Sequence, residues 1–392
     1  MTGDDFVYLD NNATTPLDPA VIEEMLPFLT KQYGNPSGGY AFAARARKAV
    51  DLAREQLAAL LGCEPSEIVF TSGGTESNNA VIHSALQFEP RGKHVVTSAV
   101  EHSAVLRPCQ DFEKRSCTVT FLGVDRHGNI DLGELEAAIR PHTALISIMW
   151  ANNETGVLFP VEKIAGICRQ KGLLFHTDAV QAVGKIPIHL RDTAINFLSL
   201  SAHKFHGPKG VGALYVNRRT RFTPLIAGGG QENGRRGGTE NVASIVGLGK
   251  AAELALKYLE EGNCSVLSMR DRFEKAVLET VNGASVNGAD APRIPNTSSL
   301  SFEGIESSAA LLLLDRNRIC CSAGSACRTG SQEASHVLRA MNPNGDGARR
   351  SLRFSFGRFN TDPEIDRAIE IVPKVIEKLR QTSAPAPVAT AL

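Results

Sequence analysis

The feature that most constrains the fold is an alternation of short apolar segments with amphipathic ones between about residues 40 and 260. The apolar segments predict buried strands at residues 68–71, 94–97, 119–124, 144–150, 173–177, 197–201 and 211–216. Helix-like segments lie between several of them, at residues 132–139 and 161–171, and another precedes them at 43–61. Strands that alternate with helices predict an α/β fold whose mostly parallel sheet is covered on both faces. In such sheets, ligands bind beyond the carboxyl ends of the strands.

The pattern changes after Gly262, which suggests a second domain in this chain of 392 residues. A helix is expected at 266–280, followed by a Pro/Asn/Ser-rich stretch at 292–299 and by strand and helix signals through about residue 379. We therefore expect a large domain at 15–262 and a smaller α+β domain formed by 1–14 and 263–382. The tail at 383–392 contains Ala-Pro-Ala-Pro and is expected to be disordered.

The balance of charge excludes broad classes of function. Lys plus Arg and Asp plus Glu both number 42, so the formal net charge is zero. General nucleic-acid and membrane-surface binders need a basic excess, and we expect neither kind of partner. The acidic N-terminus lacks the apolar core of a secretory signal, and no apolar run approaches the roughly 20 residues of a membrane span. Eight cysteines in so long a chain are not a disulfide scaffold, which favours reduced thiols in the cytoplasm.

The sequence Ser-Gly-Gly-Thr-Glu at 72–76 follows a predicted strand and opens a predicted helix. Glycines let the backbone approach an anion closely, and a helix N-terminus offers free N–H groups to it. Thr75 adds a hydroxyl donor. A phosphate site and a plain tight turn with an N-cap threonine both explain this short motif.

A carboxylate and a lysine stand at the ends of two successive predicted strands. Asp178 ends one strand, and Lys204 follows the next. This pair suits pyridoxal 5'-phosphate (PLP): the lysine forms a Schiff base, and the carboxylate keeps the pyridine nitrogen protonated. The alternative is a surface lysine beside a metal-binding histidine. His203 and His206 lie three residues apart, but no acidic or thiol partner is nearby, so we expect no metal site.

Two further polar residues follow predicted strands. His102 is placed to stack on a cofactor ring or to act as an acid or base, although a lone histidine is more often structural. Asn153 lies in an Asn-Asn-Glu sequence after the strand that ends at Trp150. An asparagine there can donate to the phenolic oxygen of the cofactor.

These residues belong to motifs that resemble the cysteine desulfurases, especially the nitrogen-fixation type, within the aminotransferase class-V family of fold-type-I PLP enzymes. The resemblance spans residues 8–371 and rests on the sequences LDNNATTP (9–16), TSGGTESNN (71–79), VEHSAV (100–105), MWANNETG (149–156), HTDAVQAVGK (176–185), SLSAHKFHGPKGVG (199–212), RRGGTEN (235–241), SAGSAC (322–327) and LRFSFGRF (352–359). So many motifs in one order are specific, whereas any one alone is not.

The resemblance implies a role for each matched residue. For the cofactor, it implies that Lys204 forms the Schiff base, that Asp178 pairs with the pyridine nitrogen and that Gln181 binds the phenolic oxygen. His102 is implied to stack on the ring and to move protons, with Asn153 also at the cofactor. The phosphate is implied to be held by Gly74, Thr75, Ser201 and His203. Thr239 matches a residue that reaches the phosphate of a partner subunit, which implies a homodimer. Asn153 and Arg353 match residues that hold the substrate carboxylate. A guanidinium can grip a carboxylate with two parallel bonds.

Cys327 narrows the reaction that the resemblance implies. It lies in the small-residue sequence SAGSAC, which predicts a mobile loop. The implied reaction converts L-cysteine to L-alanine and leaves the sulfur as a persulfide on Cys327, to be passed to an acceptor such as an iron–sulfur scaffold protein. The thiolate is the reactive form, and Arg328 beside it can lower its pKa. For an isolated cysteine, an inert buried residue is the usual interpretation.

Several features leave alternatives open. Cys320, Cys321 and Cys327 together suggest a metal site with three thiol ligands. Adjacent residues of a strand point to opposite faces, so Cys320 and Cys321 are poorly placed to bind one metal ion. A transient contact of Cys327 with an iron–sulfur cluster stays open. Cys321, Arg328 and the Gly-rich stretch 342–350 depart from the pattern of the family, which leaves acceptor choice unsettled. The other functions considered are a selenocysteine lyase or related β-eliminating enzyme, and a non-catalytic scaffold. The sequence does not say whether the sulfur serves nitrogenase maturation, general cluster assembly or another acceptor.

Overall fold

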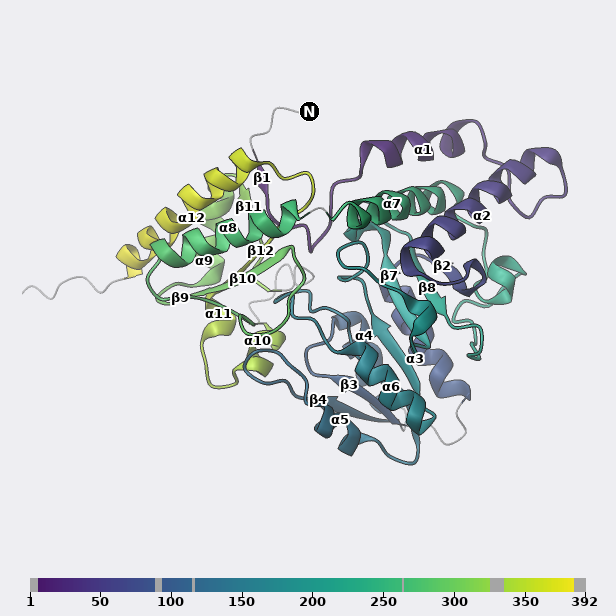
Figure 1. Cartoon of the computed structure of the whole chain (residues 1–392), viewed down its shortest axis with the longest axis horizontal. Coiled ribbons are helices and arrows are strands. Elements are labelled where there is room, and N and C mark those ends of the chain that lie inside the picture. Colours follow the sequence, from purple (N-terminus) through teal and green to yellow (C-terminus); the bar gives the residue numbers. More distant parts are fainter. Residues whose placement is uncertain (1–5, 89–93, 115–116, 263, 325–334, 384–392) are drawn as a thin grey trace, which may run out of the picture.

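The structure is a computed structural model, and it describes residues 6–88, 94–114, 117–262, 264–324 and 335–383. Figure 1 shows two bodies side by side, a larger one built on a seven-stranded sheet and a smaller one built on a three-stranded sheet. Among the described residues, no helix combines the length and the apolar character that crossing a membrane requires.

The large sheet has the strand order β2-β8-β7-β6-β5-β3-β4. Its strands are β2 (Ile68–Thr71), β3 (His94–Ser98), β4 (Thr118–Leu122), β5 (Thr143–Ser147), β6 (Leu174–Asp178), β7 (Phe197–Ser201) and β8 (Gly212–Val216). All pairs are parallel except those of β8, which runs antiparallel to both β2 and β7. The predicted mostly parallel sheet is therefore confirmed.

Helices cover both faces of this sheet because successive strand residues point to opposite sides. Val69, Leu145 and Phe197 face α3 and α4, whereas Phe70, Ile146 and Leu198 face the core that contains α2, α6 and α7. The helices of the larger body are α1 (Pro19–Thr30), α2 (Ala41–Leu61), α3 (Gly74–Phe88), α4 (Ser103–Glu113), α5 (Leu132–Ala138), α6 (Val161–Lys171) and α7 (Val242–Glu260).

The sequence explains why the longest of these helices ends where it does. Apolar residues of α2 recur at spacings of three and four, which places Ala46, Val50 and Leu57 on one buried face. The helix stops at Gly62, whose φ of 61° is the left-handed conformation that favours glycine at a helix C-terminus. The prediction of a helix at 43–61 is confirmed, with a start two residues earlier.

The smaller body contains a second hydrophobic core around an antiparallel sheet of order β12-β10-β9. Its strands are β9 (Ala284–Val286), β10 (Thr297–Phe302) and β12 (Ser351–Ser355), with α8 (Ser265–Thr280), α9 (Ser307–Arg316), α11 (Gly347–Arg350) and α12 (Asp362–Ser383). The short helix α10 (His336–Met341) packs Val337, Leu338 and Met341 into the core of the larger body. The N-terminal strand β1 (Val7–Tyr8) pairs in parallel with β11 (Ile319–Cys320). The domain boundaries proposed above stay predictions, and the predicted disordered tail lies almost entirely outside the described residues.

Candidate active site

The carboxyl ends of six strands, all except that of β8, lie at one edge of the large sheet. Strands β2 and β7 run in the same direction because both are antiparallel to β8. A cavity of about 540 Å³ lies at this edge. Apart from Thr239 and Cys327, every predicted site residue lines it: Gly74, Thr75, His102, Asn153, Asp178, Gln181, Ser201, His203, Lys204 and Arg353. The fold thus gathers residues that are separated by up to about 280 positions in the chain.

One end of the cavity is a cup at the N-terminus of α3. A side chain at Gly74 would put its Cβ only 2.6 Å from Cγ2 of Val180, so the backbone approaches the neighbouring turn as only glycine allows. The first N–H groups of the 15-residue helix lack partners within the helix and suit an anion. Ser201 and His203 line the cavity from the end of β7. Burial and the nearby Lys204 lower the pKa of His203 to about 4, so the ring is neutral.

Glu76 braces this cup from the outside. Its Oε2 accepts a hydrogen bond of 2.8 Å from the backbone N–H of Ser72, and Arg236 holds both of its oxygens at 2.9 and 3.2 Å. Burial alone raises the pKa of Glu76, but the bonds from Arg236 and Ser72 outweigh it and lower the pKa below its ordinary value. The carboxylate therefore stays charged and keeps the turn before α3 in place.

Asp178 lies at the end of β6 and is only 5% exposed. Its Oδ2 accepts from Nδ2 of Asn78 at 2.7 Å, and its Oδ1 accepts from the N–H of Val180 at 3.0 Å. Within the described part of the chain, no lysine, arginine or histidine forms an ion pair with it. A buried carboxylate without a cation is costly, and this one faces the cavity, so it suits a ligand that brings a positive N–H. The pyridine nitrogen of PLP is such a group.

Lys204 reaches the cavity from a short 3₁₀ turn at Ala202–Lys204, directly after β7. Its Nζ donates to the carbonyl oxygens of Asn12 at 2.5 Å and Ala13 at 2.8 Å. Because β6 and β7 are adjacent in the sheet, Lys204 and Asp178 come from neighbouring strand ends, as the sequence predicts. A lysine, a carboxylate and an anion cup around one cavity fit PLP.

His102 is the N-cap of α4, where its Nδ1 accepts from the N–H of Ala104 at 3.1 Å. The ring lines the cavity. The preceding residue, Glu101, is fully buried and binds the hydroxyl of Ser98 and the N–H of Met149 through Oε1. Burial raises the pKa of Glu101 to about 8. Through its two hydrogen bonds, Glu101 holds in place the backbone segment that carries His102.

The other end of the cavity is built by Arg353 of β12, from the smaller body. Its Nη2 donates to Oδ1 of Asp10 at 2.7 Å, and its Nη1 donates to the carbonyl of Asn153 at 2.8 Å. Its buried Nε has no partner among the described residues. A guanidinium has five N–H donors, so this arginine is held in place and retains donors for a carboxylate.

Cys327 lies outside the described residues, but the residues on either side of its segment do not. The backbone of Ser322 pairs with that of Arg353 through hydrogen bonds of 3.1 and 2.6 Å. Gly324 and Ser335 meet at one buried carboxylate, since the hydroxyl of Ser335 donates to Oε2 of Glu154 at 2.5 Å and a Cβ at Gly324 would lie 3.0 Å from the same oxygen. The segment of Cys327 therefore leaves and rejoins the described fold beside the Arg353 end of the cavity.

The other two thiols near this segment are poor nucleophiles. Burial raises the pKa of the Cys321 thiol. Burial also raises the pKa of the Cys320 thiol, with the negative charges of Asp315 and Asp10 adding to the effect. Among the described residues, no group of three or more histidine, cysteine or acidic side chains is arranged to hold a metal ion.

Thr239 is exposed and does not line the cavity of its own chain. Its loop is tied to the body by Arg236, which binds Glu76, and by Glu232, which binds Arg54 of α2 at 2.8 Å. The loop of Thr239 is thus held near the cup, although Thr239 itself does not line the cavity.

Sequence reasoning missed residues that hold the predicted ones. Asn12, Asn78 and Asp10 contact Lys204, Asp178 and Arg353, and Lys185 contacts Gln181. All four lie inside motifs that were recognised in the sequence. Asn78 follows Gly74 by one helical turn, and this spacing could have indicated that it faces the same cavity.

Comparison with known proteins assigns the chain to a family. The profile described as aminotransferase class-V matches residues 7–368. A protein from Nostoc sp. named cysteine desulfurase is 52% identical over 377 residues, which cover 96% of this chain and 94% of that protein. The Azotobacter vinelandii protein named cysteine desulfurase NifS is 50% identical over 378 residues and covers 96% and 94%, respectively.

Solved structures agree with these relatives. A protein described as NifS-like superposes with a TM-score of 0.88 at 38% identity, covering 95% of this chain and all of the other. SspA in complex with cysteine superposes with a TM-score of 0.80 at 38% identity, covering 90% and 99%.

Proposed function

Because this chain belongs to the cysteine desulfurases of the aminotransferase class-V family, which are PLP enzymes, we propose that it carries the sulfur of L-cysteine as a persulfide on Cys327. The observation that supports this most directly is the single cavity in which Lys204, Asp178 and the α3 cup meet Arg353. We further propose that two domains, with the boundaries given above, supply the cofactor end and the Arg353 end of this cavity.

The residues that line the cavity would hold each part of PLP. Lys204 would hold the cofactor covalently, Asp178 would pair with the pyridine N–H, and Gln181 would donate to the phenolic oxygen. Gly74, Thr75, Ser201 and His203 would hold the phosphate. When bound, PLP supplies an electron sink that weakens bonds at the substrate carbon atoms.

The remaining groups place the substrate and move protons. Arg353 and Asn153 hold the carboxylate of L-cysteine, and Asp10 fixes Arg353 from behind. His102 and the amine of Lys204 both line the cavity, where they would move protons. Ser322, at the described edge of the segment that contains Cys327, pairs with Arg353 through backbone hydrogen bonds.

The sulfur step is a nucleophilic displacement on sulfur. The thiolate of Cys327 forms an S–S bond to the substrate sulfur as the C–S bond breaks. The electron pair of the C–S bond stays on carbon, which then takes a proton. L-Cysteine and the Cys327 thiol thus become L-alanine and a Cys327 persulfide, with no other oxidant or reductant.

Substitution of Cys327 tests the proposal. Purified Cys327→Ala protein should keep its bound PLP and its visible absorption but lose alanine formation from L-cysteine. Cys321→Ala, a matched change at a thiol whose pKa is raised, should retain turnover. Unchanged cysteine turnover by Cys327→Ala would contradict the persulfide mechanism, and turnover of L-selenocysteine alone would favour a selenocysteine lyase.

We also propose that the enzyme is a homodimer in which Thr239 contacts the phosphate site of the partner. Apolar side chains are exposed on α1, on the following loop and at the start of α2: Ile22, Leu26, Leu29, Tyr33, Tyr40 and Phe42. Tyr33 and Phe42 are in ring contact, and exposed apolar side chains on neighbouring segments favour a protein interface. A second copy suits it because Glu232 ties the loop of Thr239 to α2. Sedimentation should give a dimer, and the monomer expected from Leu26→Glu and Leu29→Glu should bind PLP less tightly.

The final acceptor is proposed from the resemblance to the nitrogen-fixation type. We place the enzyme in the cytoplasm, where it passes persulfide sulfur to a scaffold protein for iron–sulfur clusters, those of nitrogenase included. Co-purification of a scaffold protein, followed by cluster formation that depends on L-cysteine, tests this. A tRNA-thiolating acceptor recovered instead would contradict it.

A further inference from the structure

Lys185 is a partly buried lysine that has no acidic partner among the described residues. It follows the turn after β6, and its Nζ donates to Oε1 of Gln181 at 2.6 Å and to Oδ1 of Asn12 at 3.0 Å. No ion pair with a carboxylate involves it in the described part of the chain. It does not line the cofactor cavity, whereas Gln181 and Asn12 do.

The three residues form a closed set of hydrogen bonds. Lys185 binds the side chains of Gln181 and Asn12, and Nε2 of Gln181 donates to the backbone oxygen of Asn12 at 2.9 Å. That oxygen also accepts from Nζ of Lys204 at 2.5 Å. Lys185 is therefore linked to the lysine that carries PLP and to the amide that faces its phenolic oxygen.

An amide side chain has two orientations that differ only in the exchange of N and O. Lys185 can only donate, so Oε1 of Gln181 must face it and Nε2 must face away. One N–H of Nε2 binds Asn12, which leaves the second N–H for the cavity. With the amide reversed, Oε1 would face an anionic phenolic oxygen and repel it.

We propose that Lys185 is a positioning residue that locks Gln181 with its N–H toward the phenolic oxygen of PLP. This inference rests on the proposed function, because it extends the role assigned there to Gln181. Lys185 does not touch the cofactor and acts through the amide.

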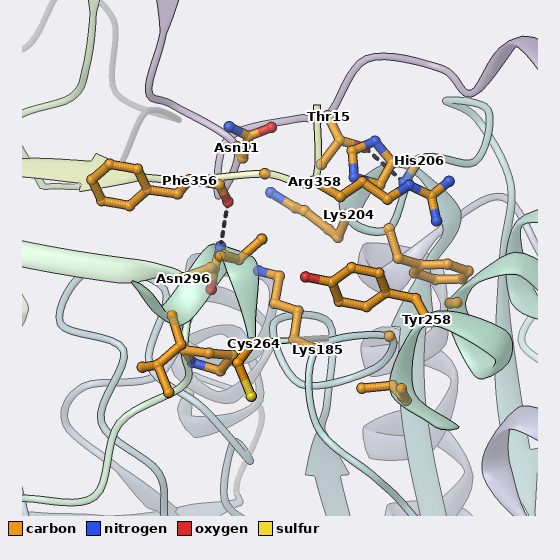
Figure 2. A pocket seen from close by; sticks show the side chains of 18 of the residues that line it. Asn11, Thr15, Lys185, Lys204, His206, Tyr258, Cys264, Asn296, Phe356 and Arg358 are labelled. Carbon is orange, nitrogen blue, oxygen red and sulfur yellow. Dashed lines mark hydrogen bonds between the residues drawn. The ribbon is translucent and has the colours of Figure 1, made fainter. Parts of the chain in front are cut away.

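Lys185 lies among cationic and uncharged groups in the described part of the chain. Figure 2 shows Lys185 and Lys204 at a second cavity of about 250 Å³, on which Tyr258 and Asn296 also border. The described residues that line it include no Asp or Glu, and the other titratable groups there are Tyr258, His206, Arg358 and Cys264. Burial, then the charges of Lys204 and Arg353, lowers the pKa of Lys185 well below its ordinary value. Lys185 therefore donates to two uncharged acceptors, Gln181 and Asn12.

The test is the pH midpoint of the visible absorption band of PLP bound to the enzyme. A donor at the phenolic oxygen stabilises the anion, so its loss raises the pKa of that oxygen. Gln181→Leu should therefore raise the midpoint by roughly one unit, and Lys185→Met should raise it in the same direction by about half a unit. Lys185→Gln, which keeps a neutral donor, should shift it less.

A double variant separates action through Gln181 from a general effect. If Lys185 acts through the amide, Gln181→Leu with Lys185→Met should have the midpoint of Gln181→Leu alone, since coupled residues are not additive. Lys163→Met, a change at an exposed lysine of α6, is the matched control and should leave the midpoint unchanged. Lys185→Leu is made in parallel, so that poor folding of one variant does not decide the result.

The outcomes are distinguishable. A midpoint that moves in Gln181→Leu but not in Lys185→Met or Lys185→Leu overturns the role of Lys185 and leaves the proposed function intact. Additive shifts in the double variant also overturn it. No shift in Gln181→Leu overturns the assignment of Gln181 in the proposed function, and the role of Lys185 with it.

Discussion

The two ends of the active-site cavity are built differently. At the cofactor end, Asp178, Lys204 and the α3 cup come from the strand ends of one sheet, so hydrogen-bonded register fixes their separations. At the carboxylate end, Arg353 comes from the smaller body and is positioned by Asp10 and the carbonyl of Asn153. The first end is set by secondary structure, and the second by the packing of two bodies against each other.

The two ends also differ in what their charges contact. Asp178 has only neutral donors around it among the described residues and requires a cationic ligand group. Arg353 already has an acidic partner and offers only its spare donors. The cofactor end should therefore respond to mutation through cofactor binding, and the carboxylate end through substrate binding.

The largest effect is expected at Asp178. Asp178→Ala removes the charge that pairs with the pyridine N–H, and loss of one partner of a buried pair costs about 3–5 kcal/mol. We expect kcat/KM for L-cysteine to fall by roughly a thousandfold, together with weaker retention of PLP. Steady-state kinetics and dialysis against buffer without PLP measure both. Asp192→Asn, at an exposed aspartate, is the control, and full activity of Asp178→Ala would contradict the assignment.

Arg353→Lys should give the next largest effect. The lysine keeps the charge but loses the planar fork that binds a carboxylate and Asp10 together, at a cost of about 2–3 kcal/mol. KM for L-cysteine should rise by roughly 30- to 100-fold, while PLP stays bound. Arg316→Lys, at an exposed arginine, is the control. Loss of PLP from Arg353→Lys would break the distinction between the two ends.

Asp10→Asn sharpens the same distinction with a smaller effect. The amide can still accept from Arg353, but the charge-assisted part of the bond is lost, about 1 kcal/mol. KM should rise by roughly fivefold with little change in kcat. A decrease in kcat alone would show that Asp10 does not act through substrate binding.

The smallest effect on activity is expected from His176, beneath the cofactor end. Its ring bridges the hydroxyls of Ser147 on β5 and Ser199 on β7 at 2.8 and 2.9 Å, and burial lowers its pKa to about 3. Between pH 6.5 and 3 the unfolded chain binds a proton that the folded chain does not, so the free energy of unfolding decreases as pH falls. His176 alone should remove about 2 kcal/mol between pH 7 and pH 5.

Urea unfolding at these two pH values measures this contribution. His176→Gln should lose less stability on acidification than the parent, whereas His189→Gln, at an exposed histidine, should behave like the parent. Equal losses in His176→Gln and the parent would contradict a buried neutral histidine.

The sequence predicted the residues at the cofactor end of the cavity better than the residues that hold them in place. The apolar runs of the sequence predicted the first and last residues of β2 and β7 correctly, because buried strands carry a strong local signal. The predicted strand at 144–150 ran too far, since Ile148, Met149 and Trp150 are buried beyond the end of β5 without continuing the strand. Strand direction carries no local signal, so the antiparallel β8 could not be foreseen.

The supporting contacts depend on tertiary structure. Asn12 meets Lys204 across 192 positions, and Asp10 meets Arg353 across 343. No local pattern predicts such pairs. Only the recognised motifs indicated that these segments share a site.

The central claim is that Lys204 holds PLP at the strand ends, and it has a direct test. The purified enzyme is reduced with borohydride, which converts a Schiff base into a stable amine. The protein is then digested, and the masses of its peptides are measured by mass spectrometry. We expect a pyridoxyl phosphate group on Lys204 and none on Lys185, the neighbouring amine. The label on Lys185, or on neither lysine in protein that retains PLP absorption, would contradict it.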